Sequence, residues 1–167
     1  LSAGACAAPQ RNVPVIFIPG PPEKPRLQVL MNIGTEADLA GRKSGGLALL
    51  GKQEKVKGFG KPYGVALRGR KLYVADTGMQ TVHVVDFGRK KFGSLQGDHG
   101  MGKLRLPVNL AFDAEGNLYV TDTARQQIVE LDPAGRHVRT IGDGSSFKPS
   151  GIAVRGEEIF VTDLKGQ

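Results

Sequence analysis

The sequence has few of the residue types on which several classes of functional site depend. It contains one cysteine, Cys6, no tryptophan, and only seven Phe and three Tyr. A single cysteine excludes an intrachain disulfide and a thiolate metal cluster. So few aromatic side chains give little indication of a stacking platform for sugars. No stretch reaches the ~20 consecutive apolar residues that a membrane-spanning helix requires.

Positive charge is plentiful, but its distribution argues against a nucleic-acid surface. The formal net charge is +7, a balance that is typical of nucleic-acid-binding proteins. Residues 1–61 contain nine Lys and Arg against four Asp and Glu, a net of +5, whereas residues 62–167 contain fourteen against twelve, a net of +2. Because the excess lies mostly in the N-terminal part, we do not expect a nucleic acid as the partner.

The segment around Cys6 indicates export. Residues 3–5, Ala-Gly-Ala, precede Cys6 and are the small residues that signal peptidases read. They also resemble the lipobox of bacterial lipoproteins, in which the Cys is diacylated and becomes the new N-terminus, although that motif prefers Leu where this sequence has Ala3. We expect lipidation of Cys6; secretion with a free thiol and a chance cysteine are the alternatives.

Three zones follow one another along the chain. Residues 1–25 combine the signal-peptide remnant with a Pro-rich stretch that predicts an extended tether. Residues 26–61 begin with RLQVLMNIG, a predicted strand, and continue as a connecting segment with a loop or short helix. Residues 62–167 consist of copies of one pattern.

The copies recur with the period of propeller blades. Matching prolines are separated by 45 and 42 residues and matching aspartates by 46 and 41; they are Pro62, Pro107 and Pro149, and Asp76, Asp122 and Asp163. A period of about 40–46 residues that holds several short strands is typical of β-propellers. We predict an all-β fold, a partial β-propeller of four-stranded antiparallel blades at about 62–106, 107–148 and 149–167, the last incomplete.

Each copy predicts the same strands. The first covers 64–67, 108–112 and 151–154, the second 72–75, 118–121 and 159–162, and the third 81–85 and 127–131; a weaker fourth lies near 92–97 and 137–142. The second strand is continuously apolar or small, as expected of a strand buried between blades. The clearer alternation of the third predicts a position nearer the solvent.

An aspartate closes the second strand of each copy, where the chain must reverse direction. Such a side chain accepts backbone N–H bonds from the following turn, and a threonine hydroxyl supports the same turn. Gly78 supplies permissive backbone geometry in the first copy. The predicted structural turn residues are Asp76, Thr77, Asp122, Thr123 and Asp163.

The ordered detail of these copies resembles a known family. PYGVAL followed by KLYVADTGMQTVHVVD, and PVNLAF followed by NLYVTDTARQQIVELD, are similar to NHL repeats over about residues 61–167, with Met79 in place of the usual Asn and Asn109 in place of Gly. NHL domains form six-bladed propellers. The resemblance therefore implies a fragment whose ring is completed by missing residues of the same chain, in a protein similar to bacterial lipoproteins that carry such propellers.

No catalytic or metal-ligating constellation is predicted. His83, His99 and His137 are dispersed, without the spacing of a metal site; His83, on the third strand, is expected to face solvent or the adjacent blade. Residues 46–52, GLALLGK, match half of a phosphate loop, but Gln53 follows where Ser or Thr is needed.

Candidate ligand contacts come from the loops of one face, because propellers commonly bind partners there. The predicted contacts are Met79, Gln80, His99, Arg125 and Gln126. A second feature is the basic cluster of Arg68, Arg70, Lys71 and 89–91, which is either a solvated rim or a contact for anionic lipid, glycan or RNA.

The leading interpretation is an exported, lipid-anchored NHL-repeat propeller that acts as a protein- or glycan-binding scaffold in the bacterial cell envelope, facing the periplasm or the cell surface. It would need no cofactor beyond the acyl modification of Cys6, and its membrane contact would be the lipid anchor. The alternatives are a metal-dependent propeller lyase or hydrolase, whose site would lie largely in missing blades, and an RNA-binding NHL domain.

Overall fold

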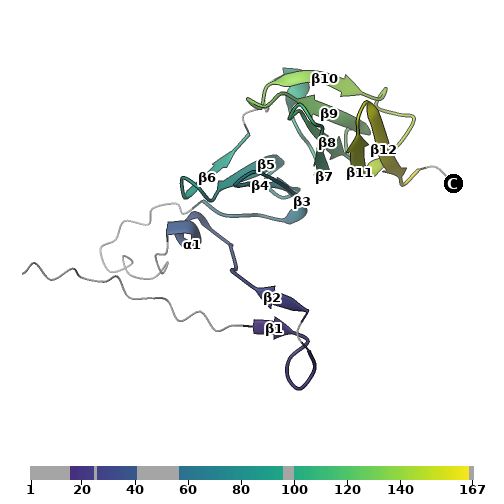
Figure 1. The fold of residues 1–167 in the computed structure, drawn as a ribbon. Coiled ribbons are helices and arrows are strands. Elements are labelled where there is room, and N and C mark those ends of the chain that lie inside the picture. Colours follow the sequence, from purple (N-terminus) through teal and green to yellow (C-terminus); the bar gives the residue numbers. More distant parts are fainter. Residues whose placement is uncertain (1–15, 25, 41–56, 96–99, 166–167) are drawn as a thin grey trace, which may run out of the picture. The chain divides into compact units, whose positions relative to one another are not determined.

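The computed structural model describes residues 16–24, 26–40, 57–95 and 100–165. The chain divides into two compact units, residues 1–33 and 34–167. Strands dominate both units (Figure 1). Among the described residues, no helix is both long enough and apolar enough to span a membrane.

The first unit contains a small antiparallel pair of strands. Strand β1 (Ile16–Ile18) pairs with β2 (Leu27–Val29), so that Ile16 lies opposite Val29. All six residues are exposed. The predicted strand near residue 27 is therefore present, and the predicted tether contains its pairing partner. The expected division between residues 25 and 26 falls between these two paired strands.

The second unit contains three successive antiparallel sheets, which we call blades 1, 2 and 3 (Figure 1). Each of the first two has four strands in sequence order, and the third has two. Blade 1 contains β3 (Pro62–Arg68), β4 (Lys71–Asp76), β5 (Thr81–Asp86) and β6 (Lys91–Ser94). Blade 2 contains β7 (Pro107–Phe112), β8 (Leu118–Asp122), β9 (Gln127–Leu131) and β10 (His137–Ile141). Blade 3 contains β11 (Pro149–Arg155) and β12 (Glu158–Asp163).

The predicted all-β class with four-stranded antiparallel sheets is confirmed. The repeated proline and aspartate are register partners in every blade: Pro62 with Asp76, Pro107 with Asp122, and Pro149 with Asp163. The register shifts immediately after the proline in each pair. The sequence repeat therefore marks the same end of each hairpin.

Apolar side chains from blades 1 and 2 form one core. Strand β8 is buried at every residue, in agreement with its predicted run of apolar or small residues, because both of its faces are covered. Strand β9, predicted to lie nearer the solvent, is instead buried from Ile128 to Leu131. That expectation was wrong because both faces of this strand are covered. The core residues are Ala75, Val82, Leu104, Leu110, Leu118, Val120, Val129 and Leu131.

Two short helical segments accompany the sheets. Helix α1 (Glu36–Ala40) begins after Thr35, whose backbone N–H and hydroxyl both donate to the Asp38 carboxylate at 2.8 and 3.1 Å. Side-chain hydrogen bonds of this kind satisfy backbone donors that a helix start leaves free. The 3-10 turn η2 (Gly100–Gly102) precedes blade 2.

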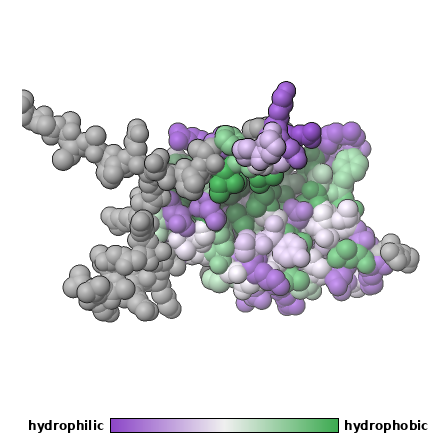
Figure 2. Space-filling model, turned by 90° about the horizontal axis from the view of Figure 1, so that it is seen from below, coloured by the Kyte–Doolittle hydropathy of each residue, from purple (hydrophilic) through white to green (hydrophobic). Residues whose placement is uncertain are grey.

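Apolar residues also reach the surface, in a patch bordered by hydrophilic residues (Figure 2). Val65 and Leu67, which alternate along β3 and so share a face, are 60% and 66% exposed. Within the described parts of the chain, this face of β3 is therefore not packed into the core.

Candidate ligand-binding site

The aspartate at the end of β4 organises the backbone on both sides of it. The Asp76 carboxylate accepts N–H bonds from Gly78 and Met79 in the following turn, both at 2.9 Å. It also accepts N–H bonds from Gly60 at 2.6 Å and Lys61 at 2.8 Å, just before β3. We call this arrangement the Asp clamp, because one carboxylate joins the start of a blade to its β4–β5 turn. The sequence predicted the donors of the following turn but not those of the segment before β3.

The Asp clamp recurs in the other blades. Asp122 accepts N–H bonds from Arg105 at 2.6 Å, and from Leu106 and Arg125 at 3.0 Å. Asp163 accepts from Lys148 at 2.7 Å and Lys165 at 2.8 Å. Asp76 and Asp122 are fully buried, so these bonds offset the cost of removing each carboxylate from water.

The Asp76 clamp changes the ionisation of its carboxyl group. Burial alone would raise the pKa of Asp76, but the N–H donors of Lys61, Met79 and Gly60, together with His83, outweigh it and lower the pKa. Asp76 is therefore ionised at neutral pH and has its oxygens occupied by donors. Such a group is poorly suited to accept a proton from a substrate.

The sequence analysis expected His83 to face the solvent or the adjacent blade, and this expectation was wrong. His83 is only 3% exposed; its Nε2 lies 3.3 Å from Asp76 Oδ2, and its Nδ1 is 3.1 Å from Ser94 Oγ. The rings of Phe59 and Phe92 pack against the imidazole, with centroids at 5.5 and 5.0 Å. Burial lowers the pKa of His83, although Asp76 opposes this shift, so the ring is neutral at neutral pH.

Threonine hydroxyl groups join blade 2 to blade 3. Thr121 Oγ1 donates to the Ser150 carbonyl at 2.8 Å, and Thr123 Oγ1 donates to the Pro149 carbonyl at 2.7 Å. In blade 1, Thr77 Oγ1 instead donates to the Lys61 carbonyl of its own blade at 3.1 Å. The predicted turn role of Thr123 therefore includes a bond between blades that no local pattern indicated.

The predicted ligand-contact residues of the β4–β5 and β8–β9 turns differ in accessibility. Met79 is 57% exposed. Gln80 and Gln126 occupy equivalent turn positions with φ of 55° and 56°, so the left-handed residue is glutamine and not Gly78. Gly78 instead lies at a close approach, where a Cβ would be 3.0 Å from the Lys61 backbone nitrogen. Gln126 Oε1 is buried and has no hydrogen-bond partner among the described residues.

Arg125 is used within the protein. Its Nη1 donates to the carbonyls of Met101 and Lys103, both at 2.7 Å, and its Nε donates to Gln127 Oε1 at 3.1 Å. The guanidinium therefore holds the connection that precedes blade 2, and little of its hydrogen-bonding capacity remains for a ligand.

Three other predicted features lie elsewhere. Cys6, His99 and the 46–52 segment fall outside the described residues. His137 contacts Thr140 Oγ1 through Nε2 at 2.9 Å and lies far along the sequence from the other histidines. In the described parts of the chain, no group of three or more His, Cys, Asp or Glu side chains could hold a metal ion.

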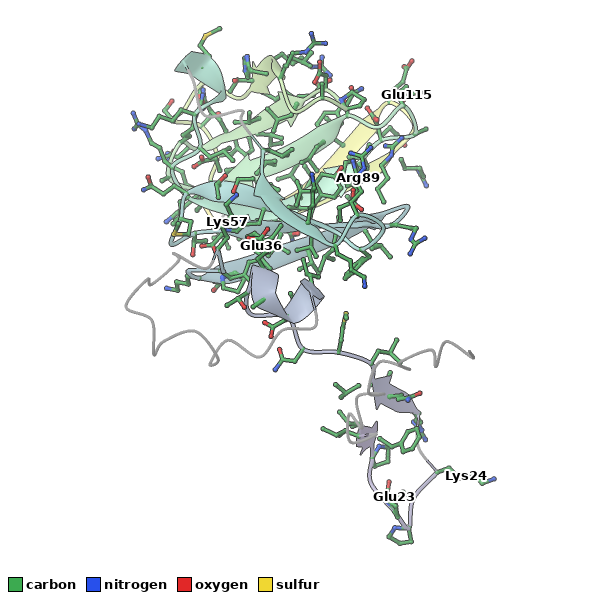
Figure 3. The ribbon with its side chains drawn as sticks, turned by 90° about the vertical axis from the view of Figure 1, so that its left-hand side faces the viewer. Glu23, Lys24, Glu36, Lys57, Arg89 and Glu115 are labelled. Carbon is green, nitrogen blue, oxygen red and sulfur yellow. The ribbon has the colours of Figure 1, made fainter. Side chains whose placement is uncertain are left out.

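A cleft of about 670 Å³ lies between blades 1 and 2, at the strand ends opposite the Asp clamps. The β3–β4 and β5–β6 turns of blade 1 contribute four side chains of the predicted basic cluster, and the β7–β8 and β9–β10 turns of blade 2 contribute the other wall. Figure 3 shows Arg89 and Glu115, which belong to two of these turns, on the same side of the molecule. The main lining side chains are Arg68, Arg70, Lys71, Tyr73, Asp86, Arg89, Leu95, Phe112, Leu118, Asp132 and Pro133.

The Arg68 side chain of blade 1 connects the two walls of the cleft by contacting blade 2. Its guanidinium lies over the Phe112 ring at 5.4 Å and donates through Nη1 to the Asp113 carbonyl at 3.3 Å. Gly116 makes room for it: a Cβ there would lie 2.5 Å from Arg68 Cζ, and the glycine has a φ of 102°. Sequence analysis identified the basic cluster but could not find the partners of Arg68, because they lie 44 or more residues away.

Comparison with known protein families and with curated proteins gives no match. Solved structures do match. A streptogramin B lyase structure is 18% identical with a TM-score of 0.52, covering 63% of this chain and 35% of the lyase. A catalytically inactive virginiamycin B lyase from Staphylococcus aureus with quinupristin is 17% identical with a TM-score of 0.50, covering 64% of this chain and 36% of the lyase.

These lyases are propellers. The sheets of residues 62–165 are therefore blades of a β-propeller-like fold. The chain spans little more than a third of each of these structures. At such low identity the likeness concerns the fold and not the reaction.

Proposed function

We propose that this chain belongs to an exported, lipid-anchored propeller of the NHL-repeat type, which acts as a binding scaffold for protein or glycan in the bacterial cell envelope. The observation that carries the proposal is the recurrence of the Asp clamp at Asp76, Asp122 and Asp163. Each clamp commits a carboxylate to backbone donors and fixes the turn that follows. The result is a rigid scaffold that displays variable turn residues.

The NHL assignment is supported by where the motif residues lie. The proline that begins the motif and the aspartate that ends its second strand are paired in all three blades. Because the proline and the aspartate lie opposite each other in every hairpin, both residues recur together in the sequence. Further residues of the same chain would complete the ring.

The exposed turn after each clamp is the proposed contact surface. Met79 and Gln80 are exposed in the β4–β5 turn, whereas Arg125 is held by carbonyl groups. We therefore propose the β4–β5 turn of blade 1 as the main contact for the partner.

Export and anchoring are tested together by labelling cells with radioactive palmitate. Cys6→Ser is expected to abolish the label and release the protein from membranes, and the matched variant Ala8→Ser is expected to keep both. A Cys6→Ser protein that remains equally membrane-bound contradicts the anchor. A maleimide-reactive Cys6 in a soluble exported protein would instead establish plain secretion.

The binding role is tested by site-specific photocrosslinking in intact cells. Benzoylphenylalanine at Met79 is expected to give a discrete crosslinked species. The same group at Glu157, exposed in the turn at the other end of the strands, is the control. Equal crosslinking at both positions, or none at Met79, contradicts the proposed contact surface.

A further inference from the structure

The cleft between blades 1 and 2 lies at the opposite strand ends from the proposed contact surface, and its role is independent of export or anchoring. We propose that this cleft binds a small organic anion. Its phosphate or carboxylate group would meet the basic rim formed by Arg70, Lys71 and Arg89. Its apolar or planar body would pack on the floor formed by Tyr73 and Phe112.

The cationic groups of the rim are only partly balanced within the protein, since Asp86 attracts Lys71 and Arg89 electrostatically. Among the described residues, the side chains of Arg70, Lys71 and Arg89 form no hydrogen bond or ion pair. With Arg68, the lining has four basic side chains against two acidic ones, Asp86 and Asp132, a net of +2. These three side chains are exposed at the mouth of the cleft, where guanidinium and ammonium groups can bind an anion through charge-assisted hydrogen bonds.

The two acidic side chains of the lining accept hydrogen bonds from their own turns. Asp86 Oδ1 accepts the Arg89 N–H at 2.9 Å, and this bond is the main reason that the pKa of Asp86 is lowered. Asp132 accepts N–H bonds from Ala134 and Arg136, and its Oδ2 also accepts from Arg136 Nε at 2.7 Å. Asp132 is thus paired with Arg136 and not with the rim, whereas Asp86 attracts Lys71 and Arg89 without a direct side-chain hydrogen bond to either.

The floor of the cleft is mainly apolar. The rings of Tyr73 and Phe112 meet edge to face with centroids 4.8 Å apart, and Leu95 and Leu118 also line the space. Burial raises the pKa of Tyr73, although Arg68 opposes this, so its hydroxyl stays protonated and can donate. A floor of this composition favours a ligand with an apolar or aromatic body over a bare inorganic ion.

The cleft is formed before any ligand binds. Arg68 bridges blade 1 to Phe112 and Asp113 of blade 2, and Leu95 of blade 1 reaches Gly135 of blade 2, where a Cβ would lie 3.1 Å from Leu95 Cδ2. A volume of about 670 Å³ is within the range that accommodates small-molecule ligands. Binding therefore requires little reorganisation of the two sheets.

The test uses isothermal titration of the whole chain with 1-naphthyl phosphate, which has a planar body and a dianionic head. We expect a single saturable site with a dissociation constant of about 0.1–1 mM. Arg70→Gln with Arg89→Gln is expected to weaken binding at least about tenfold, because two charge-assisted bonds are lost. Lys90→Gln is the matched control, since Lys90 lies in the same turn but does not line the cleft, and it should leave binding unchanged.

Further titrations separate the two parts of the site. Phe112→Leu should weaken 1-naphthyl phosphate several-fold and leave inorganic phosphate, a weaker ligand, unaffected; neutral 1-naphthol should not bind measurably. Circular dichroism of each variant checks folding, and Lys71→Gln replaces the double variant if that protein is unfolded.

Three results would overturn the proposal. They are the absence of saturable binding of 1-naphthyl phosphate, equal weakening by Lys90→Gln, and binding only to vesicles that contain phosphatidylglycerol. The last would assign the basic rim to a membrane surface and not to a free ligand. None of these results bears on the palmitate or crosslinking experiments, so the two proposals fail separately.

Discussion

Blades 1 and 2 have the same strands and the same clamp, yet each is joined to the next blade by different chemistry. Blade 2 meets blade 3 through the hydroxyls of Thr121 and Thr123. In blade 1, Ala75 occupies the position of Thr121, and Thr77, the counterpart of Thr123, donates within its own blade. Blade 1 meets blade 2 instead through the Arg68 guanidinium.

A glycine completes the contact between blades 1 and 2. A Cβ at Gly64 would lie 2.6 Å from the Val108 carbonyl oxygen and 2.7 Å from Asn109 Cα. The backbones therefore approach more closely there than a side chain permits. The comparison teaches that the repeat determines each sheet, whereas the residues that differ between copies determine how the sheets join and where a cleft remains.

Removing a buried clamp should have the largest effect on stability. Asp122→Ala leaves the N–H groups of Arg105, Leu106 and Arg125 without their acceptor, and we expect the free energy of unfolding to fall by about 3–5 kcal/mol. Asp163→Ala, at an exposed clamp, should cost about 1 kcal/mol. Urea denaturation followed by circular dichroism measures both. Equal losses would show that burial does not set the strength of the clamp.

The β7–β8 and β3–β4 turns should respond differently to added side chains. Gly116→Ala places a Cβ against Arg68 and strains a φ of 102°, so we expect a loss of about 2–3 kcal/mol. Gly69→Ala, at a φ of 58° with nothing within 4 Å of the added Cβ, should cost about 1 kcal/mol. Urea denaturation measures the difference between the two variants. If the clash with Arg68 is responsible, Arg68→Ala should reduce the cost of Gly116→Ala.

Equivalent threonines should also differ. Thr123→Val removes a buried hydrogen bond to blade 3 and leaves the Pro149 carbonyl without that donor, for an expected loss of about 1–2 kcal/mol. Thr77→Val removes an exposed bond within blade 1 and should cost less than about 0.5 kcal/mol. Thermal unfolding of the two variants side by side measures the difference, and a larger loss for Thr77→Val would contradict the assignment of Thr123 to the joint.

The smallest predicted effect is a pH dependence due to His83 of blade 1, whose place Val129 takes in blade 2. The folded pKa of His83 lies below its ordinary value near 6.5, so the unfolded chain binds the proton more readily. Stability should be constant above that value and should fall as the pH is lowered below it. His83→Val should remove this slope in urea titrations between pH 7 and pH 5, while the loss caused by carboxylate protonation below about pH 4 remains. A slope that persists in His83→Val would assign it to another group.

Sequence reasoning located the strands well because hydrophobic patterning and turn residues are local properties. The predicted strands at 72–75 and 118–121 lie inside β4 and β8, and the paired proline and aspartate explain why a fixed period was visible. It failed where burial depends on what covers a strand, as at β9 and His83. It also could not predict the cleft, since Arg68 and Phe112 come from different copies and meet only when the sheets stack.

The Asp clamp also bears on the order of assembly during synthesis. Each clamp closes over only 15–17 residues of chain, and pairings between residues near in sequence form faster than distant ones. A growing chain can thus finish one hairpin with its own carboxylate before the next has left the ribosome. The aspartate is therefore also a local closing point that each hairpin can reach without waiting for the rest of the ring.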